Sequence, residues 1–167
     1  MFFKLHRDME RKIIMSSKLK ILEHHKNFIE FVQSLEKLDE QVLRTPITEG
    51  KWSIIQIVGH FQPWDEFLLE KRLPFIFSES TLPAAPNSFE LNAEAAQLAE
   101  EHSVSVTLNN LISTRVKLLS RINTLPEENW SVKFKINQKT LTLETYLLGL
   151  IQHDLHHLNQ IRTFIQV

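Results

Sequence analysis

Helix-forming residues dominate this chain, and glycine is almost absent from it. Only three of its 167 residues are glycine, whereas leucine, isoleucine, glutamate, lysine and glutamine occur in long runs. These five residue types, unlike glycine, have high or moderate helix propensity. The composition therefore favours an all-α chain, and its length is that of one domain with a sizeable hydrophobic core.

Apolar residues recur at intervals of three and four along four long segments, which predicts four helices. Pro46 ends the first of them, because a proline disfavours helix in the residue before it. Ser53 and Gln56 have the spacing of a capping box and mark the start of the second. We expect the helices at about residues 16–43, 53–72, 92–124 and 142–167. Four long helices in a chain of this length are typical of a four-helix bundle.

The remaining segments are connections or an extension. We expect residues 1–15 to be an N-terminal extension to a bundle domain that spans residues 16–167. Three prolines and two serines between residues 73 and 86 predict a long loop. Polar and apolar residues alternate over residues 131–142 around Asn137-Gln138, which predicts an irregular hairpin or extended loop.

The charge balance and the absence of cysteine exclude several classes of function. The net charge is -1, with 19 basic and 20 acidic residues, and no helix carries a dense basic stripe. Nucleic acid is therefore not an expected partner. No apolar run reaches the roughly 18 to 20 residues that span a bilayer, so no membrane is expected either. A chain without cysteine has no thiolate ligand or disulfide, which fits the cytoplasm.

Three histidines carry the strongest functional signal. His153 and His157 are four residues apart on the last predicted helix and therefore share one face. His60, on the second helix, lies in a stripe with Ile57 and Trp64, so all three imidazoles are expected to face the bundle interior. Three neutral imidazoles on one divalent metal leave a coordination position open, as in catalytic metal sites. The alternative, three core histidines hydrogen-bonded separately, stays open at this point.

The other histidines and a proline carry weaker signals. His156 lies off the face of His153 and His157, whereas His102 falls on the apolar face of the third helix. Pro63 removes a backbone hydrogen bond inside the second helix and predicts a kink close to His60. Solvent exposure is expected for His6, His24 and His25, and a place in the core for Trp52 and Trp64.

Two motifs resemble those of DinB-like proteins. Trp52-Ser53 leading into His60, followed by Trp64-Asp65-Glu66, resembles the second-helix signature of that family. The C-terminal pattern His153-x-x-x-His157-x-x-Gln160-Ile161 resembles its closing motif. The resemblance extends from about residue 16 to the end of the chain. It implies an up-down-down-up four-helix bundle, commonly a homodimer, with one divalent metal ion held by His60, His153 and His157.

The resemblance also implies a class of reaction. Family members with known activity include bacillithiol and mycothiol transferases, so we expect a thiol S-transferase or a metal-assisted hydrolase that acts on a small molecule. Coordination to a divalent ion, here zinc or nickel, lowers the pKa of a water or thiol. Because the chain has no cysteine, a reacting thiol would have to be a cosubstrate. Asp65, Glu66 and Asp154 are the candidate general bases, and a solvated helix surface is the alternative for each.

Two further classes of protein compete with an enzyme. One is a non-catalytic bundle that binds a metal or an apolar ligand without turnover. The other is a structural or interaction protein whose buried histidines hold no metal.

Overall fold

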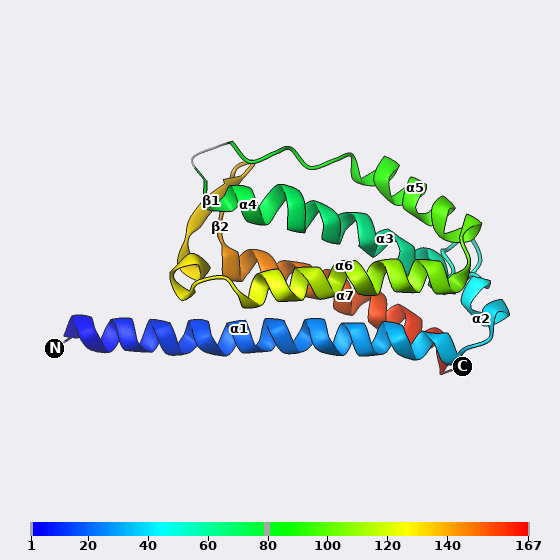
Figure 1. The fold of residues 1–167 in the computed structure, drawn as a ribbon, viewed down its shortest axis with the longest axis horizontal. Coiled ribbons are helices and arrows are strands. Elements are labelled where there is room, and N and C mark those ends of the chain that lie inside the picture. Colours follow the sequence, from blue (N-terminus) through cyan, green and yellow to red (C-terminus); the bar gives the residue numbers. More distant parts are fainter. Residues whose placement is uncertain (1, 79–80, 167) are drawn as a thin grey trace.

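Four long helices form the bundle shown in Figure 1. The structure, a computed structural model, describes residues 2–78 and 81–166, with side chains for residue 15 and from residue 17 onward. Helices α1 and α7 run in one direction along the bundle, and α3 and α6 run in the opposite direction (Figure 1). This order is the expected up-down-down-up topology. The bundle helices are α1 (Phe2–Ser34), α3 (Ile54–Phe67), α6 (Val104–Asn123) and α7 (Leu143–Ile165).

A long crossover connects α3 to α6, which run in the same direction. After α3 the chain makes a π-helical turn, η2 (Leu68–Arg72), and a short helix, α4 (Leu73–Ile76). Residues 81–87 and helix α5 (Ser88–Glu101) then return it along the length of the bundle (Figure 1). The loop predicted from residue 73 therefore begins only after α4. Because of this return, α6 starts at the same end of the bundle as α3.

The prediction of one helix over residues 92–124 was wrong. Helix α5 ends at Glu101, and His102 and Ser103 both have extended backbone. The Ser103 hydroxyl accepts a hydrogen bond from the Val106 N–H, at 3.4 Å, and so caps a new helix. His102, expected on an apolar face, is exposed at this break.

The first helix also has different limits from those predicted. It begins at Phe2 and ends at Ser34, and a 3-10 turn, η1 (Leu35–Lys37), follows it. A separate short helix, α2 (Glu40–Arg44), is capped by the Asp39 carboxylate, which accepts from the Gln41 N–H at 2.8 Å. The domain boundary expected between residues 15 and 16 falls inside α1 and stays a prediction.

The predicted hairpin is present at the end of the bundle where α7 begins (Figure 1). Strands β1 (Lys133–Ile136) and β2 (Lys139–Thr142) pair antiparallel, after a 3-10 turn, η3 (Glu127–Ser131). Asn137 in the turn has a φ of 54°, a left-handed conformation that asparagine tolerates better than most residues. As predicted, Thr142 caps α7, and its hydroxyl accepts from the Thr145 N–H at 3.2 Å.

The buried apolar side chains form two clusters along the bundle. One surrounds Phe28, Phe61 and Leu158, and the other surrounds Leu118 and Trp130 near the hairpin. None of the described helices combines the length and the hydropathy needed to cross a membrane.

Gly59 sets how closely α5 packs against α3. A Cβ atom at Gly59 would lie 2.6 Å from the Cβ of Ala99 and 3.2 Å from the carbonyl oxygen of Ala95. No side chain larger than hydrogen fits there without moving α5. The glycine therefore permits a close helix–helix contact directly beside His60.

We expect Gly59→Ala to destabilise the protein by about 1–3 kcal/mol, because the added methyl group overpacks this contact. Gly149→Ala is the matched control, since nothing lies within 4 Å of a Cβ at that position on α7. There the loss of a helical glycine should stabilise the fold by about 0.5–1 kcal/mol. Urea unfolding of both variants measures the difference, and equal midpoints would contradict the close contact.

Candidate metal centre

The structure brings the three predicted histidines together. His60 comes from α3, and His153 and His157 come from successive turns of α7. One ring nitrogen of each lies within 4.8 Å of those of the other two. The His60 ring centroid is 4.6 Å from that of His157 and 5.4 Å from that of His153. Such spacing is small enough for one ion to contact all three rings.

Hydrogen bonds orient two of these rings. The Nδ1 atom of His60 is 2.5 Å from the Ile57 carbonyl oxygen, and the Nδ1 atom of His157 is 2.8 Å from the Gln160 Oε1. An Nδ1–H that donates to an oxygen leaves Nε2 with a free lone pair, the form that binds a metal. Gln160, quoted above as part of the closing motif, thus orients a predicted ligand.

The Nε2 atom of His60 is the clearest sign that a further group belongs here. It is buried, and it has no hydrogen-bond partner among the described residues. An unsatisfied buried polar atom costs free energy. A divalent ion between the three rings would satisfy it, so the residues fit the metal that the sequence predicts.

The surroundings of the three imidazoles favour the neutral form of each ring. Burial lowers the pKa of His60 to about 3, and the neighbouring His157 and His153 contribute to that shift. Burial likewise lowers the pKa of His153 and of His157. Neutral rings bind a cation without first losing a proton. A set of three imidazoles suits zinc, nickel, copper or iron and does not choose between them.

One of the three histidines, His157, lines a cavity of about 240 Å³. His153 is exposed and His157 is half-buried, whereas His60 is buried. His157, Ile57 and Trp52 line the cavity. Trp52, assigned to the core from the sequence, is in fact half-buried, and its ring centroid is 5.2 Å from that of His60.

A buried ion cluster connects the four bundle helices next to this site. Arg115 on α6 donates from Nε to the Asp65 carboxylate on α3 and from Nη1 to the Asp154 carboxylate on α7, each at 2.6 Å. From α1, the Nε2 of His24 is 2.9 Å from Asp154, and the Nδ1 of His25 is 3.1 Å from the Arg115 Nη1. One guanidinium therefore links α6 to the three other helices.

The two buried carboxylates respond differently to this cluster. Burial raises the pKa of Asp65 to about 7, although Arg115 opposes the shift. Burial also acts to raise the pKa of Asp154, but Arg115 and the hydrogen bond from His24 outweigh it and hold that pKa below its usual range. Burial, with Arg115, lowers the pKa of His25 to about 3. Asp154 is thus the firmly ionised partner of Arg115.

The cluster corrects several predictions. Asp65 and Asp154 are not solvated, because both are buried against Arg115, and a role as general base stays a prediction for each. Glu66 is exposed and lines a different cavity, between α3, α5 and α6. The expectation that His24 and His25 are solvated was also wrong, since His25 is buried and His24 is half-buried.

The sequence did contain a signal for the cluster. His25 lies four residues after Ile21 and three before Phe28, both of them buried residues of α1. Arg115 has the same relation to Leu111 and Leu118 on α6. Polar residues inside an apolar stripe indicate a buried network.

The side chain of His6 lies outside the described part of the chain.

We expect Arg115→Met to destabilise the fold by about 3–5 kcal/mol, because it leaves an ionised Asp154 buried without its cation. Arg121→Met, on an exposed position of the same helix, should change the free energy of unfolding by less than about 0.5 kcal/mol. Denaturant unfolding at pH 7 compares the two. If both variants unfold at the same midpoint, the cluster does not hold the helices together.

Comparison with known proteins agrees with this architecture. The family model of the DinB superfamily matches residues 23–161, so the chain belongs to that superfamily. A search of curated proteins finds no match.

One solved structure shares the fold over nearly the whole chain. It is that of YfiT from Bacillus subtilis, a probable metal-dependent hydrolase with an unusual four-helix bundle topology. The two chains are 18% identical, with a TM-score of 0.74, and the match covers 89% of this chain and 86% of YfiT. A likeness at this level of identity shows a common fold.

Proposed function

We propose that this chain is a cytoplasmic, metal-dependent hydrolase of a small molecule, with zinc or nickel held by His60, His153 and His157. The observation that carries the proposal is the buried Nε2 of His60, which has no hydrogen-bond partner among the described residues and belongs to a group with two imidazoles of α7. The fold shared with YfiT, a probable metal-dependent hydrolase, supports the same class of reaction. When bound, a divalent ion would supply Lewis acidity. Thiol S-transfer, implied by the family motifs, is the second candidate.

The residues of the chain have separate tasks in this proposal. The Ile57 carbonyl and the Gln160 side chain fix the tautomers and orientations of His60 and His157. The Arg115 cluster fixes α3 relative to α7, and so the spacing of the three rings. The cavity beside His157 is lined, among the described residues, by no carboxylate. The proposal therefore assigns no general base to Asp65, Glu66 or Asp154.

Elemental analysis of protein purified without a tag or chelator tests the metal site. We expect about one divalent ion per wild-type chain and none in His157→Ala, because two imidazoles no longer complete the site. His156→Ala is the control, since its exposed ring lies outside the group of three. If both variants lose the metal equally, or if the wild type takes up neither zinc nor nickel on soaking, the proposed metal site is wrong.

The same proteins separate the candidate reactions. Metal-dependent cleavage of p-nitrophenyl esters without added thiol would support hydrolysis. Consumption of an aromatic chloride only when cysteine is added would support thiol transfer instead. A metal-loaded protein that does neither would favour the non-catalytic bundle. His157→Ala should lose whichever activity the wild type shows.

We also propose that the chain forms a homodimer, as the family resemblance implies. Light scattering at micromolar protein concentration should give twice the chain mass of 19.6 kDa. A single chain mass under the same conditions would contradict the proposal.

A further inference from the structure

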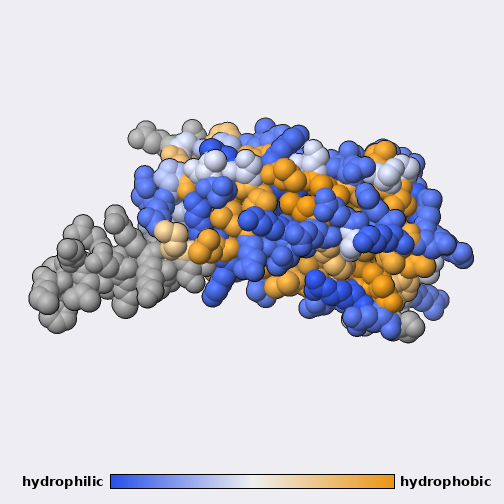
Figure 2. Space-filling model, turned by 60° about the horizontal axis from the view of Figure 1, so that its bottom comes forward, coloured by the Kyte–Doolittle hydropathy of each residue, from blue (hydrophilic) through white to orange (hydrophobic). Residues whose placement is uncertain are grey.

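A long apolar groove extends from the metal-site cavity toward the C-terminal end of α7. It encloses about 1080 Å³, comparable with the largest small-molecule sites. Leu38, Val42 and Ile47 form one wall, and Phe164 and Ile165 on α7 form the other. Val42 and Ile165 are each 37% exposed although they are apolar. In Figure 2 hydrophobic residues gather at this end of the molecule, near the C-terminus.

The groove and the metal-site cavity adjoin each other and share three lining residues. Ile47, Lys51 and Gln160 line both of them. Gln160 also holds the ring of His157, so the junction between groove and cavity lies one hydrogen bond from a metal-binding residue. A ligand that occupies the groove therefore lies beside the proposed reaction site.

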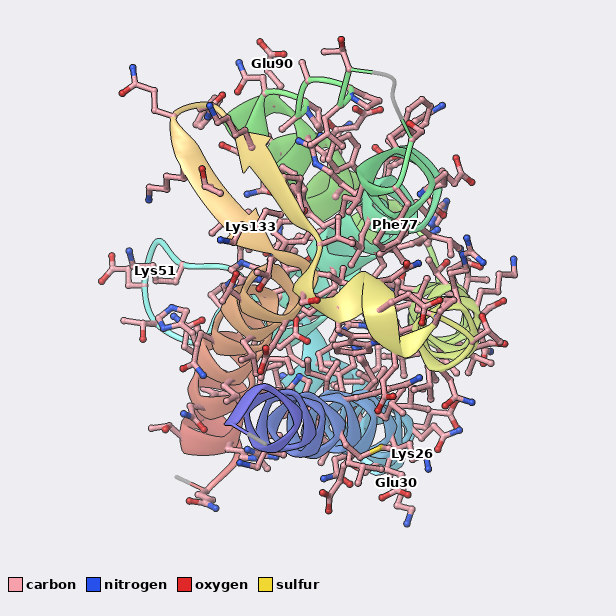
Figure 3. All side chains as sticks on the ribbon, turned by 90° about the vertical axis from the view of Figure 1, so that its left-hand side faces the viewer. Lys26, Glu30, Lys51, Phe77, Glu90 and Lys133 are labelled. Carbon is pink, nitrogen blue, oxygen red and sulfur yellow. The ribbon has the colours of Figure 1, made fainter. Side chains whose placement is uncertain are left out.

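Lys51 supplies the charge at this junction. Among the described residues that line the groove or the cavity, it is the only lysine, arginine, aspartate or glutamate. Figure 3 shows it on the loop beside α7. Apolar walls with one exposed lysine beside them match a molecule that has an apolar body and one anionic group.

We propose that this groove binds an amphipathic carboxylate, with its apolar chain between α7 and the segment from Leu38 to Ile47 and its carboxylate at Lys51. The inference rests on the proposed function and names its substrate class. Because Lys51 lines both the groove and the cavity, the reacting bond of such a substrate lies close to its carboxylate.

Decanoate below its micellar concentration is the probe, and isothermal titration calorimetry measures its binding to metal-free and zinc-loaded protein. We expect binding in both states, and at least fivefold weaker binding of decanol, which lacks the charge. Lys51→Met should weaken decanoate binding by about five- to tenfold, the loss of one charged hydrogen bond. Lys37→Met is the control, because that exposed lysine lines neither the groove nor the cavity.

A second pair of variants tests the apolar wall of the groove. Val42→Asp should weaken decanoate binding at least tenfold, because it places a like charge in the groove. Val116→Asp, at a position on α6 that is 47% exposed, should leave the binding unchanged. Both positions are partly exposed, so neither variant should unfold the protein. Circular dichroism confirms that each is folded.

Three outcomes would overturn the inference. In the first, decanol binds as tightly as decanoate. In the second, Lys51→Met has no more effect than Lys37→Met, as it would if the carboxylate simply bound zinc. In the third, decanoate does not bind and Val42→Asp converts a dimer to a monomer, which would make the groove an interface between two copies.

The inference and the proposed function fail separately. Decanoate binding that depends on Lys51, without any metal-dependent turnover, would support the inference about the ligand and contradict the proposed enzymatic function. Metal-dependent turnover in a protein that does not distinguish decanoate from decanol would support the proposed enzymatic function and contradict the inference about the ligand.

Discussion

The arrangement of the bundle depends on the ion pairs and hydrogen bonds that the buried guanidinium of Arg115 makes. Burying a cation is costly unless its partners surround it, and here they come from the three other bundle helices. The two carboxylates lie on the same helices as the candidate metal histidines, because Asp65 follows His60 by five residues and Asp154 is next to His153. Moving α7 along α3 would break both the ion cluster and the group of three imidazoles. Structure and site are therefore fixed by one set of contacts.

The topology provides the second constraint. Helices α3 and α6 run in the same direction, so the chain has to return along the whole bundle between them (Figure 1). Helix α5 makes that return and packs so closely on α3 that only glycine fits at position 59. Pro63 lies one turn further along α3, whose helix continues through it. The back of the helix that carries His60 is thus covered by α5, and its front faces α7.

Local sequence signals predicted the parts of this structure that short-range physics determines. The capping residues Ser53 and Thr142, the hairpin around Asn137 and the shared face of His153 and His157 all follow from spacing within one or two turns. The break at Ser103 was missed because neither proline nor glycine marks it, and a serine in a helical pattern is ambiguous. The place of Arg115 in an apolar stripe indicated its burial, but the sequence did not identify its partners. Its partners come from three other helices, and no one-dimensional pattern shows which charges meet when distant segments pack.

The uneven burial of the three imidazoles has a kinetic consequence. Two of the rings lie on one helix at or near the surface, and only His60 is buried. An ion held there has a path to solvent that does not require the bundle to open, unlike the closed structural sites whose metal is released only on unfolding. Exchange of the ion would then not be limited by unfolding of the chain. The ion carried by each molecule would follow the supply of metals around it, rather than the metal present when the chain folded.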